Sequence, residues 1–142
     1  MDRHASAHWE GGLKDGKGTV STESGVLDSQ SYAFSTRFED EKGTNPEELI
    51  GAAHASCFSM ALSMVLGEEG YKAERIDTKA SVNISQSADG FDISKIHLDV
   101  KASVSGADEA AFKKAAETAK KNCPVSKVLN AEITMDAELI DG

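Results

Sequence analysis

The apolar segment that begins at Asn45 and ends near Gly70 limits most strongly how this chain can fold. Pro46 suits the first position of a helix behind an Asn45 cap. Glu47 and Glu48 then complement the positive end of the helix dipole, and the segment predicts a helix of about 24 residues. Its apolar side chains cover nearly all faces, which is typical of a helix surrounded by protein. A chain of 142 residues has little material to surround it, so we expect a second subunit to complete the enclosure.

Strands are predicted on both sides of this helix, where apolar residues gather between turn signals that contain glycine. The predicted strands are Ala7–Glu10, Lys17–Thr22 and Ser31–Phe38 before the helix, and Asp77–Ser85, Phe91–Val104 and Glu132–Leu139 after it. In the fifth of these strands the apolar residues change from odd to even positions. This change of parity predicts a bulge near Ser94 and Lys95.

Two shorter helices are predicted in the last third of the chain. One follows a cap formed by Ser105 and Asp108, carries its apolar residues on one side and ends near Lys120. The other is a single helical turn, Val125–Leu129. Together with the strands they predict an α+β fold in one domain, residues 1–142, without repeats or a disordered linker.

The charge of the chain argues against two classes of partner. The sequence holds 15 basic and 24 acidic residues, a net charge of −9, which repels nucleic-acid phosphates and anionic lipid surfaces. The first residues lack the apolar run of a signal peptide, and polar residues interrupt the apolar helix. We therefore expect a soluble cytoplasmic protein that binds neither nucleic acid nor membranes.

The two cysteines, Cys57 and Cys123, are the candidate nucleophiles. Structural disulfides do not persist in a reducing cytoplasm, so the cysteines are either packed in the core or part of a redox site. Cys123 precedes Pro124 at a predicted helix start, where free amides and the helix dipole favour a thiolate. Cys57 lies in an apolar helix that favours the neutral thiol, so it needs a cation such as Arg37 or a protonated His54.

Other functions stay open on these residues alone. His54 and Cys57 have the spacing of two zinc ligands, but no second ligand pair accompanies them, so no metal site and no cofactor are expected. A hydrolase or acyl-transfer enzyme would use Cys57 as its nucleophile together with His54. A non-catalytic, ligand-binding stress-response dimer would use both cysteines for packing.

Two cysteine motifs and two earlier stretches carry a resemblance to a known family. The cysteine motifs are GTNPEELIGAAHASCFSMALSMVLG and KNCPVSKVLNAEITMDAEL, and the earlier stretches are HWEGGLKDGKGTVSTESGVL and TRFE. Read together, they resemble the osmotically inducible protein C (OsmC) family of peroxidases over essentially the whole chain. The organic hydroperoxide resistance proteins carry their arginine in an early Gly-Arg loop, whereas here it stands in Thr36-Arg37-Phe38, which resembles the OsmC branch. The resemblance implies a long buried central helix, antiparallel strands and an intertwined homodimer.

The resemblance also implies an activity and a role for four residues. The activity is the thiol-dependent reduction of organic hydroperoxides, with hydrogen peroxide as a further candidate substrate and a dithiol as the reductant. Cys57 matches the peroxidatic cysteine and Cys123 the resolving cysteine, which together would form a disulfide after a Cys57 sulfenate. Arg37 matches the arginine that stabilises the thiolate, and Glu47 matches its carboxylate partner.

Helix geometry limits how Glu47 can assist Cys57. Ten residues on one straight helix correspond to about 15 Å along its axis, so these two side chains cannot touch within one chain. Either Glu47 reaches Cys57 of the other subunit, or residues 45–48 depart from the helix. The first option agrees with a helix that is apolar on all faces.

Overall fold

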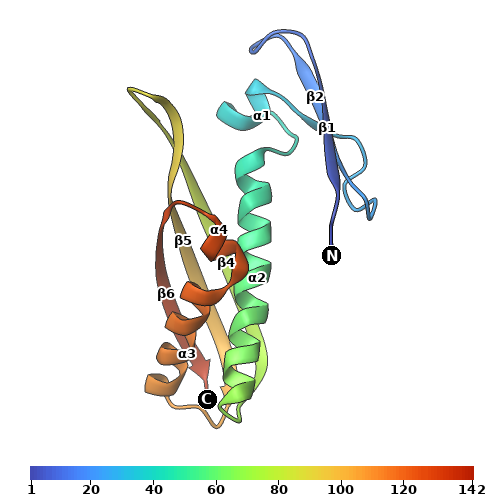
Figure 1. Ribbon diagram of the computed structural model, residues 1–142. Coiled ribbons are helices and arrows are strands. Elements are labelled where there is room, and N and C mark those ends of the chain that lie inside the picture. The colour runs from blue at the N-terminus through green and yellow to red at the C-terminus, as the bar shows by residue number, and fades with distance from the viewer. The chain divides into compact units, whose positions relative to one another are not determined.

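The computed structural model describes residues 1–142, which form two compact units, 1–49 and 50–142. Figure 1 shows the order of the elements along the chain. They are β1 (Ala5–Glu10), β2 (Lys17–Thr22), β3 (Gln30–Tyr32), α1 (Phe34–Phe38), α2 (Pro46–Glu68), β4 (Lys72–Ser87), β5 (Gly90–Ser105), α3 (Glu109–Asn122), α4 (Pro124–Val128) and β6 (Glu132–Asp141). This mixture of helices and separate sheets confirms the expected α+β class.

The first unit is built on an antiparallel sheet in the order β1-β2-β3. Gly18 in β2 lies beneath two aromatic rings, because a Cβ at this position would come within 2.7 Å of both Trp9 and Tyr32. The missing side chain lets these rings approach across the sheet, with centroids 5.5 Å apart. The strands β1 and β2 confirm the first two predicted strands.

The predicted strand Ser31–Phe38 is wrong, because β3 ends at Tyr32 and the helix α1 follows. The Thr36 hydroxyl accepts from the backbone N–H of Ala33 at 2.8 Å and donates to its carbonyl oxygen at 3.0 Å. These bonds close a helical turn locally. The rings of Phe34 and Phe38, four residues apart, then pack with centroids 4.9 Å apart.

The predicted helix is confirmed almost to the residue. The Asn45 side chain caps α2 by accepting from the backbone N–H of Glu48 at 2.8 Å, and Pro46 is the first helical residue. The helix ends at Glu68, and Gly70 takes the positive φ of 87° that suits a glycine after a helix. Because α2 is regular from Pro46 onward, residues 46–48 do not depart from the helix.

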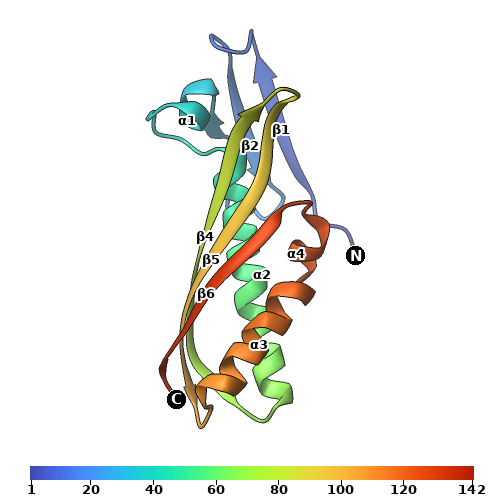
Figure 2. The ribbon, with the colours of Figure 1, turned by 90° about the vertical axis from the view of Figure 1, so that its left-hand side faces the viewer.

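The second unit contains a sheet in the order β4-β5-β6, seen in Figure 2. β4 and β5 form a long antiparallel hairpin whose pairing skips Ser94, because Asn83 faces Lys95 while Ile84 faces Ile93. This irregularity confirms the predicted bulge. β6 pairs parallel to β5, so the expectation of antiparallel strands fails for this pair. A parallel partner requires a crossover, which the segment containing α3 supplies.

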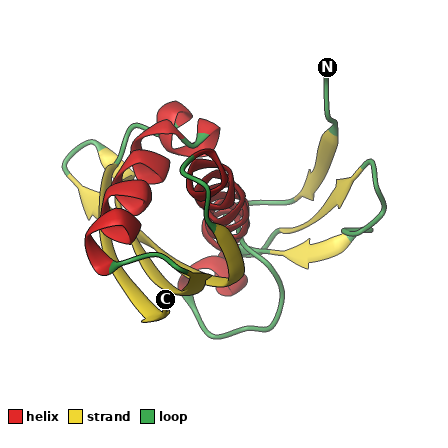
Figure 3. Cartoon of the chain, turned by 90° about the horizontal axis from the view of Figure 1, so that it is seen from below, coloured by secondary structure: helices red, strands yellow, loops and turns green.

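The core of the second unit lies between this sheet and two helices, α2 and α3, that cover the same face of it (Figures 2 and 3). β5 contributes every second residue to the core, as the strand period requires. The buried residues are Phe58, Leu62 and Leu66 of α2, Ile96, Leu98, Val100, Ala102 and Val104 of β5, and Phe112, Ala115, Ala116 and Ala119 of α3, with Ala107 and Cys123.

The start of α3 differs from the prediction. Asp108 alone is the N-cap, since its Oδ1 accepts a 2.7 Å hydrogen bond from the Ala111 N–H. Ser105 is the last residue of β5, and its hydroxyl donates to Glu74 at 3.1 Å. A cap at Ser105 is therefore wrong, because cross-strand pairing with β4 continues to this residue and keeps it in the sheet.

Candidate active site

The two cysteines predicted as nucleophiles are brought together in the second unit. Cys57 lies in the middle of α2, and Cys123 joins α3 to α4. Their side chains lie close enough for each thiol to shift the pKa of the other, and both thiols are free. Cys123 is fully buried, whereas Cys57 is half-buried. Two residues that are 66 positions apart in the sequence thus form one thiol pair.

The start of α4 surrounds the Cys123 sulfur with hydrogen-bond donors. Cys123 is the N-cap and Pro124 opens the helix, as predicted. The sulfur accepts from the backbone N–H of Ser126 at 3.4 Å and from the Ser126 hydroxyl at 3.3 Å. The backbone N–H of Val125 also acts on both cysteines and lowers the pKa of each thiol. Ser126 was not predicted from the sequence, although a residue three places after an N-cap is where the cap finds its donor.

The surroundings shift the pKa values of the two thiols in opposite directions. Burial raises the pKa of Cys57 above the ordinary thiol value; the Val125 amide lowers it, and the neighbouring Cys123 raises it further. Burial also raises the pKa of Cys123, but the hydroxyl and amide of Ser126, the Cys57 thiol and the Val125 amide outweigh burial and leave this pKa lowered. Within this unit, Cys123 therefore ionises more readily than Cys57.

His54 is the alternative cation for Cys57, and this role requires a protonated ring. Its environment does not favour protonation. It is fully buried, and its Nε2 lies 2.8 Å from the hydroxyl oxygen of Ser126. Burial lowers the pKa of His54 below its ordinary value, so the ring is neutral at pH 7. Its Nδ1 is buried without a hydrogen-bond partner. A neutral ring held by Ser126 does not supply the positive charge that Cys57 needs.

Arg37 and Glu47, the other two predicted site residues, form an ion pair in the first unit. Arg37 Nε lies 2.7 Å from Glu47 Oε1. Glu47 lies in the first turn of α2 and is 6% exposed, whereas the Arg37 side chain is 37% exposed. The pair engages the guanidinium through Nε, so its two terminal nitrogens can donate to another group, such as a thiolate or a peroxide oxygen.

A largely apolar cavity of about 210 Å³ adjoins Arg37 within the first unit. The Arg37 guanidinium carbon lies 5.2 Å from the centre of the Phe38 ring. The other lining residues are Trp9, Leu13, Tyr32, Ala33, Phe34 and Pro46. A positively charged group beside aromatic walls can accept a molecule with one polar end and one alkyl or aryl end.

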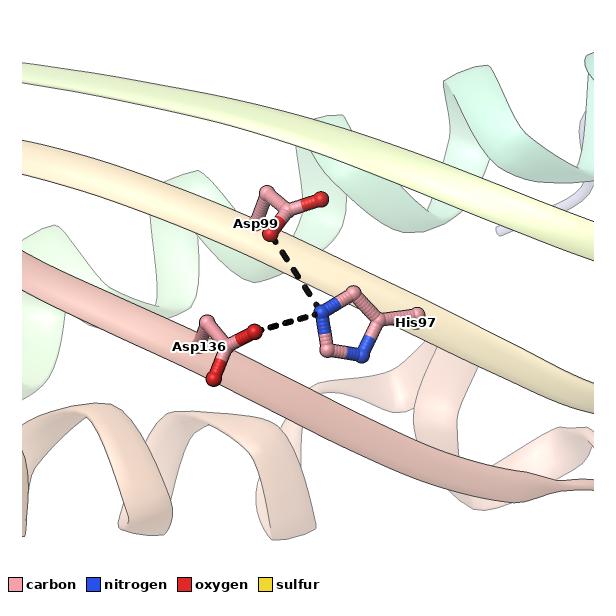
Figure 4. A group of neighbouring side chains, drawn as sticks. All are labelled: His97, Asp99 and Asp136. Atoms are coloured by element: carbon pink, nitrogen blue, oxygen red, sulfur yellow. Dashed lines mark hydrogen bonds and ion pairs between the residues drawn. The ribbon is translucent and has the colours of Figure 1, made fainter.

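A separate group of polar side chains lies on the face of β5 opposite the core, as Figure 4 shows. His97 Nε2 lies 3.3 Å from Asp99 and 3.1 Å from Asp136, while Nδ1 lies 2.6 Å from the Thr134 hydroxyl. These are the side-chain types of a divalent metal site. This group was not predicted from the sequence, because only the parallel pairing of β5 with β6 brings its residues together. The contacts within the group engage both ring nitrogens of His97.

Comparison with known proteins finds relatives over almost the whole chain. The family model described as OsmC-like protein matches residues 39–138. Peroxiredoxin OsmC of Escherichia coli (strain K12) is 58% identical over 139 residues, which cover 98% of this chain and 97% of that protein. Organic hydroperoxide resistance protein OhrB of Bacillus subtilis (strain 168) is 28% identical over 86% of this chain and 88% of that protein. The higher identity to the first relative agrees with the predicted OsmC branch.

Solved structures share the fold. The crystal structure of OhrB of Bacillus subtilis has a TM-score of 0.71 and 26% sequence identity, and the match covers 96% of this chain and 97% of that chain. An OsmC-like protein from Mycoplasma pneumoniae has a TM-score of 0.75 at 16% identity, with coverage of 99% and 98%. The second match is evidence for the fold alone.

Proposed function

The chain belongs to the OsmC-like protein family and is a thiol-dependent peroxidase, and from this premise we propose that its reaction is carried by Cys57, Cys123, Arg37 and Glu47. One observation carries the proposal. The free thiols of Cys57 and Cys123 lie close enough within one unit for each to shift the pKa of the other. A sulfenic acid formed on Cys57 therefore has a second thiol beside it to condense with.

The proposed reaction proceeds in two steps that balance on these residues. The Cys57 thiolate attacks one oxygen of the hydroperoxide, the O–O bond breaks, and the alkoxide that leaves takes up a proton to become the alcohol. Cys57 is then a sulfenic acid. Cys123 attacks its sulfur, an S–S bond forms, and the oxygen leaves as water. An external dithiol restores both thiols by disulfide exchange.

Cys57 requires a cation for the first step, because its own surroundings raise its pKa. We assign this role to Arg37, oriented by Glu47: a guanidinium beside the thiolate lowers the thiol pKa and donates hydrogen bonds to the peroxide. Since α2 is helical from Pro46, Glu47 and Cys57 of one chain are separated by about 15 Å along the helix axis. We therefore assign the role to the Arg37–Glu47 pair of a second copy of the chain.

An exposed apolar side of α2 supports the homodimer that this assignment needs. Met60 and Met64 are 78% and 62% exposed, and Ala53 lies on the same side of the helix. Phe58 and Leu62 point from the other side into the core. Exposed apolar side chains in a contiguous patch are typical of a protein interface. The all-round apolar pattern of this helix is then explained by a core on one side and a partner on the other.

The cavity beside Arg37 supports organic hydroperoxides as substrates, because aromatic walls can hold an alkyl or aryl group while the guanidinium binds the peroxide oxygens. α2 is long and apolar enough to span a membrane by composition, but we assign its exposed side to the dimer. The net charge of −9 further argues against nucleic-acid and membrane partners.

The test compares cumene hydroperoxide consumption by the wild type, Cys57→Ser and Cys123→Ser with dithiothreitol as the reductant. We expect Cys57→Ser to lose turnover and to form no sulfenate adduct with dimedone. Without dithiothreitol, whose thiols would reduce a sulfenic acid directly, Cys123→Ser should reduce one equivalent of peroxide and accumulate the Cys57 sulfenate without an intramolecular disulfide. The matched control is Ser59→Ala, which also changes a small polar side chain of α2. It removes the hydroxyl that lies 2.7 Å from the Thr78 hydroxyl. Undiminished turnover in Cys57→Ser would overturn the proposal.

A further inference from the structure

His54, Ser126 and Cys123 form a buried chain of hydrogen bonds, and the reaction above gives a role to Cys123 but none to His54 or Ser126. His54 and Cys123 are fully buried, and Ser126 is 8% exposed. His54 Nε2 lies 2.8 Å from the Ser126 hydroxyl oxygen, which lies 3.3 Å from the Cys123 sulfur. Building on the resolving role proposed for Cys123, we propose that His54 is a positioning residue for disulfide formation, which acts through Ser126 to hold the Cys123 sulfur as the attacking thiolate.

The direction of this chain follows from its donors and acceptors. The Ser126 hydroxyl donates to Cys123, so its oxygen accepts from His54, which must carry its proton on Nε2. Nδ1 is then a bare acceptor, and Nδ1 is the ring atom without a partner. The opposite tautomer would bury an N–H group with no acceptor, which is the rarer and costlier arrangement. The site therefore favours donors that point toward the Cys123 sulfur.

The hydrogen bonds from His54 through Ser126 to Cys123 act through dipoles rather than through a charge. Burial lowers the pKa of His54, which keeps the ring neutral at pH 7. The titratable group that acts directly on Cys123 is Cys57, whereas His54 reaches it only through Ser126; Cys57 and His54 both belong to α2. Lys120 at the end of α3 pairs with Glu117 instead, and the core around Cys123 is apolar. After burial, the Ser126 hydroxyl is the strongest influence on the pKa of Cys123, and it lowers it.

These hydrogen bonds affect the second step of the reaction, in which the disulfide forms. The Cys123 thiolate attacks the sulfur of the Cys57 sulfenic acid, the S–S bond forms and the S–O bond breaks. The hydroxide that leaves is protonated by solvent, which received a proton when Cys123 ionised. Without the Ser126 hydroxyl, Cys123 is a thiol in an apolar site, and the thiolate fraction at neutral pH falls by about tenfold for each unit by which its pKa rises.

The first test measures the pKa of Cys123 by thiolate absorbance in a Cys57→Ser background. Ser126→Ala and His54→Leu should raise this pKa, while His54→Gln, whose side-chain amide can donate in place of Nε2, should keep it close to the parent value. Ser59→Ala removes a comparable hydroxyl outside the chain and serves as the control. Equal pKa values in Ser126→Ala and Ser59→Ala would overturn the inference.

The second test follows disulfide formation by mass spectrometry after one equivalent of cumene hydroperoxide, with Cys57 intact. We expect Ser126→Ala to form the disulfide about tenfold more slowly at pH 7 and to recover as the pH rises. A wild-type rate at pH 7 contradicts the inference. Trapping of the Cys57 sulfenate in the same samples separates the two proposals. A wild type that forms neither the sulfenate nor the disulfide refutes the peroxidase assignment and leaves the Cys123 pKa as an independent test.

A measurement without mutation covers the case that buried substitutions prevent folding. ¹⁵N chemical shifts of the His54 ring in the reduced wild-type protein should report a neutral ring protonated on Nε2 at pH 7. A proton on Nδ1, or a charged ring, would overturn the proposed direction of the chain. Ser126→Ala should then change the His54 Nε2 shift, since it removes the acceptor of that N–H group.

Discussion

Arg37 donates from Nε to Oε1 of Glu47 across 2.7 Å, and the two residues differ in how firmly they are held. Glu47 is fixed in the first turn of α2 and is almost fully buried, whereas the guanidinium of Arg37 is partly exposed. The carboxylate therefore positions the arginine rather than the reverse. Its second oxygen is buried without a partner, so the negative charge of Glu47 depends on Arg37 for compensation.

A variant that removes the charge of Glu47 but keeps its shape tests whether the carboxylate positions Arg37. Glu47→Gln retains a carbonyl acceptor but holds the guanidinium less firmly, because a hydrogen bond between charged groups is about twice as strong as a neutral one. We expect the initial rate of cumene hydroperoxide consumption to fall by about tenfold, equivalent to one pKa unit at Cys57. Asp77→Asn removes the carboxylate of the exposed Arg75–Asp77 pair and should leave the rate unchanged. Equal rates for the two variants refute the assignment.

His54 predicts that acid destabilises the protein. Burial lowers the pKa of His54 in the folded state, so on acidification the unfolded chain binds this proton first, at a pKa of about 6.5. The free energy of unfolding should be constant above that pH for this group and fall below it, by at most about 1.4 kcal/mol per pH unit. Urea unfolding at pH 7.5, 6.5 and 5.5 measures the slope.

The matched variants for this experiment are His54→Gln and His8→Gln. The first removes the buried titration and should flatten the dependence on pH between 6.5 and 5.5. The second removes an exposed histidine and is the control for the loss of an imidazole side chain. If His54→Gln has the wild-type slope, the acid sensitivity has another source.

Local patterns in the sequence were sufficient for the parts of the fold that local chemistry determines. Asn45 and Pro46 predicted the start of α2, and Cys123 before Pro124 predicted a cap, because each signal involves residues within one helical turn. The bulge at Ser94 was predicted from a change of strand parity. Such features need no knowledge of which distant segments meet.

Features that depend on contacts between distant segments were not predicted. Ser126 bonds to His54 across 72 positions, and His97 meets Asp136 across 39 positions. Both contacts follow from tertiary packing, which no spacing in the sequence reports. The strand expected over residues 31–38 failed for a different reason: Thr36 bonds back to Ala33 and closes a helical turn, which the period of the apolar residues does not show.

The exposed side of α2 predicts that a single charge prevents dimer formation. Met60→Glu introduces a carboxylate in the middle of the apolar side, where dimerisation would remove it from water without a partner. We expect a dimer for the wild type and a monomer for Met60→Glu in size-exclusion chromatography with light scattering. Val26→Glu changes another exposed apolar residue, 83% exposed in the loop between β2 and β3, and should remain a dimer. A dimeric Met60→Glu protein would show that this side of α2 is not the interface.

Assigning Arg37 of one copy to Cys57 of the other predicts complementation between two inactive proteins. Arg37→Ala and Cys57→Ser each disable every site in their homodimers. A mixed dimer contains one site that combines the intact Cys57 of the first variant with the intact Arg37 of the second. Random exchange gives mixed dimers in half of the population, with one of two sites intact, so about a quarter of the wild-type activity should return.

The same mixture distinguishes action across the dimer from action within one chain. If Arg37 serves Cys57 of its own chain, each site of the mixed dimer lacks one of the two residues, and mixing restores nothing. Co-expression with two affinity tags isolates the mixed dimer, whose specific activity should then rise to about half that of the wild type. The matched control is the mixed dimer of Cys57→Ser with Cys57→Ser/Arg37→Ala, which contains no intact Cys57 and should stay inactive. Recovery in the first mixture alone would therefore locate the activating cation of Cys57 on the second subunit.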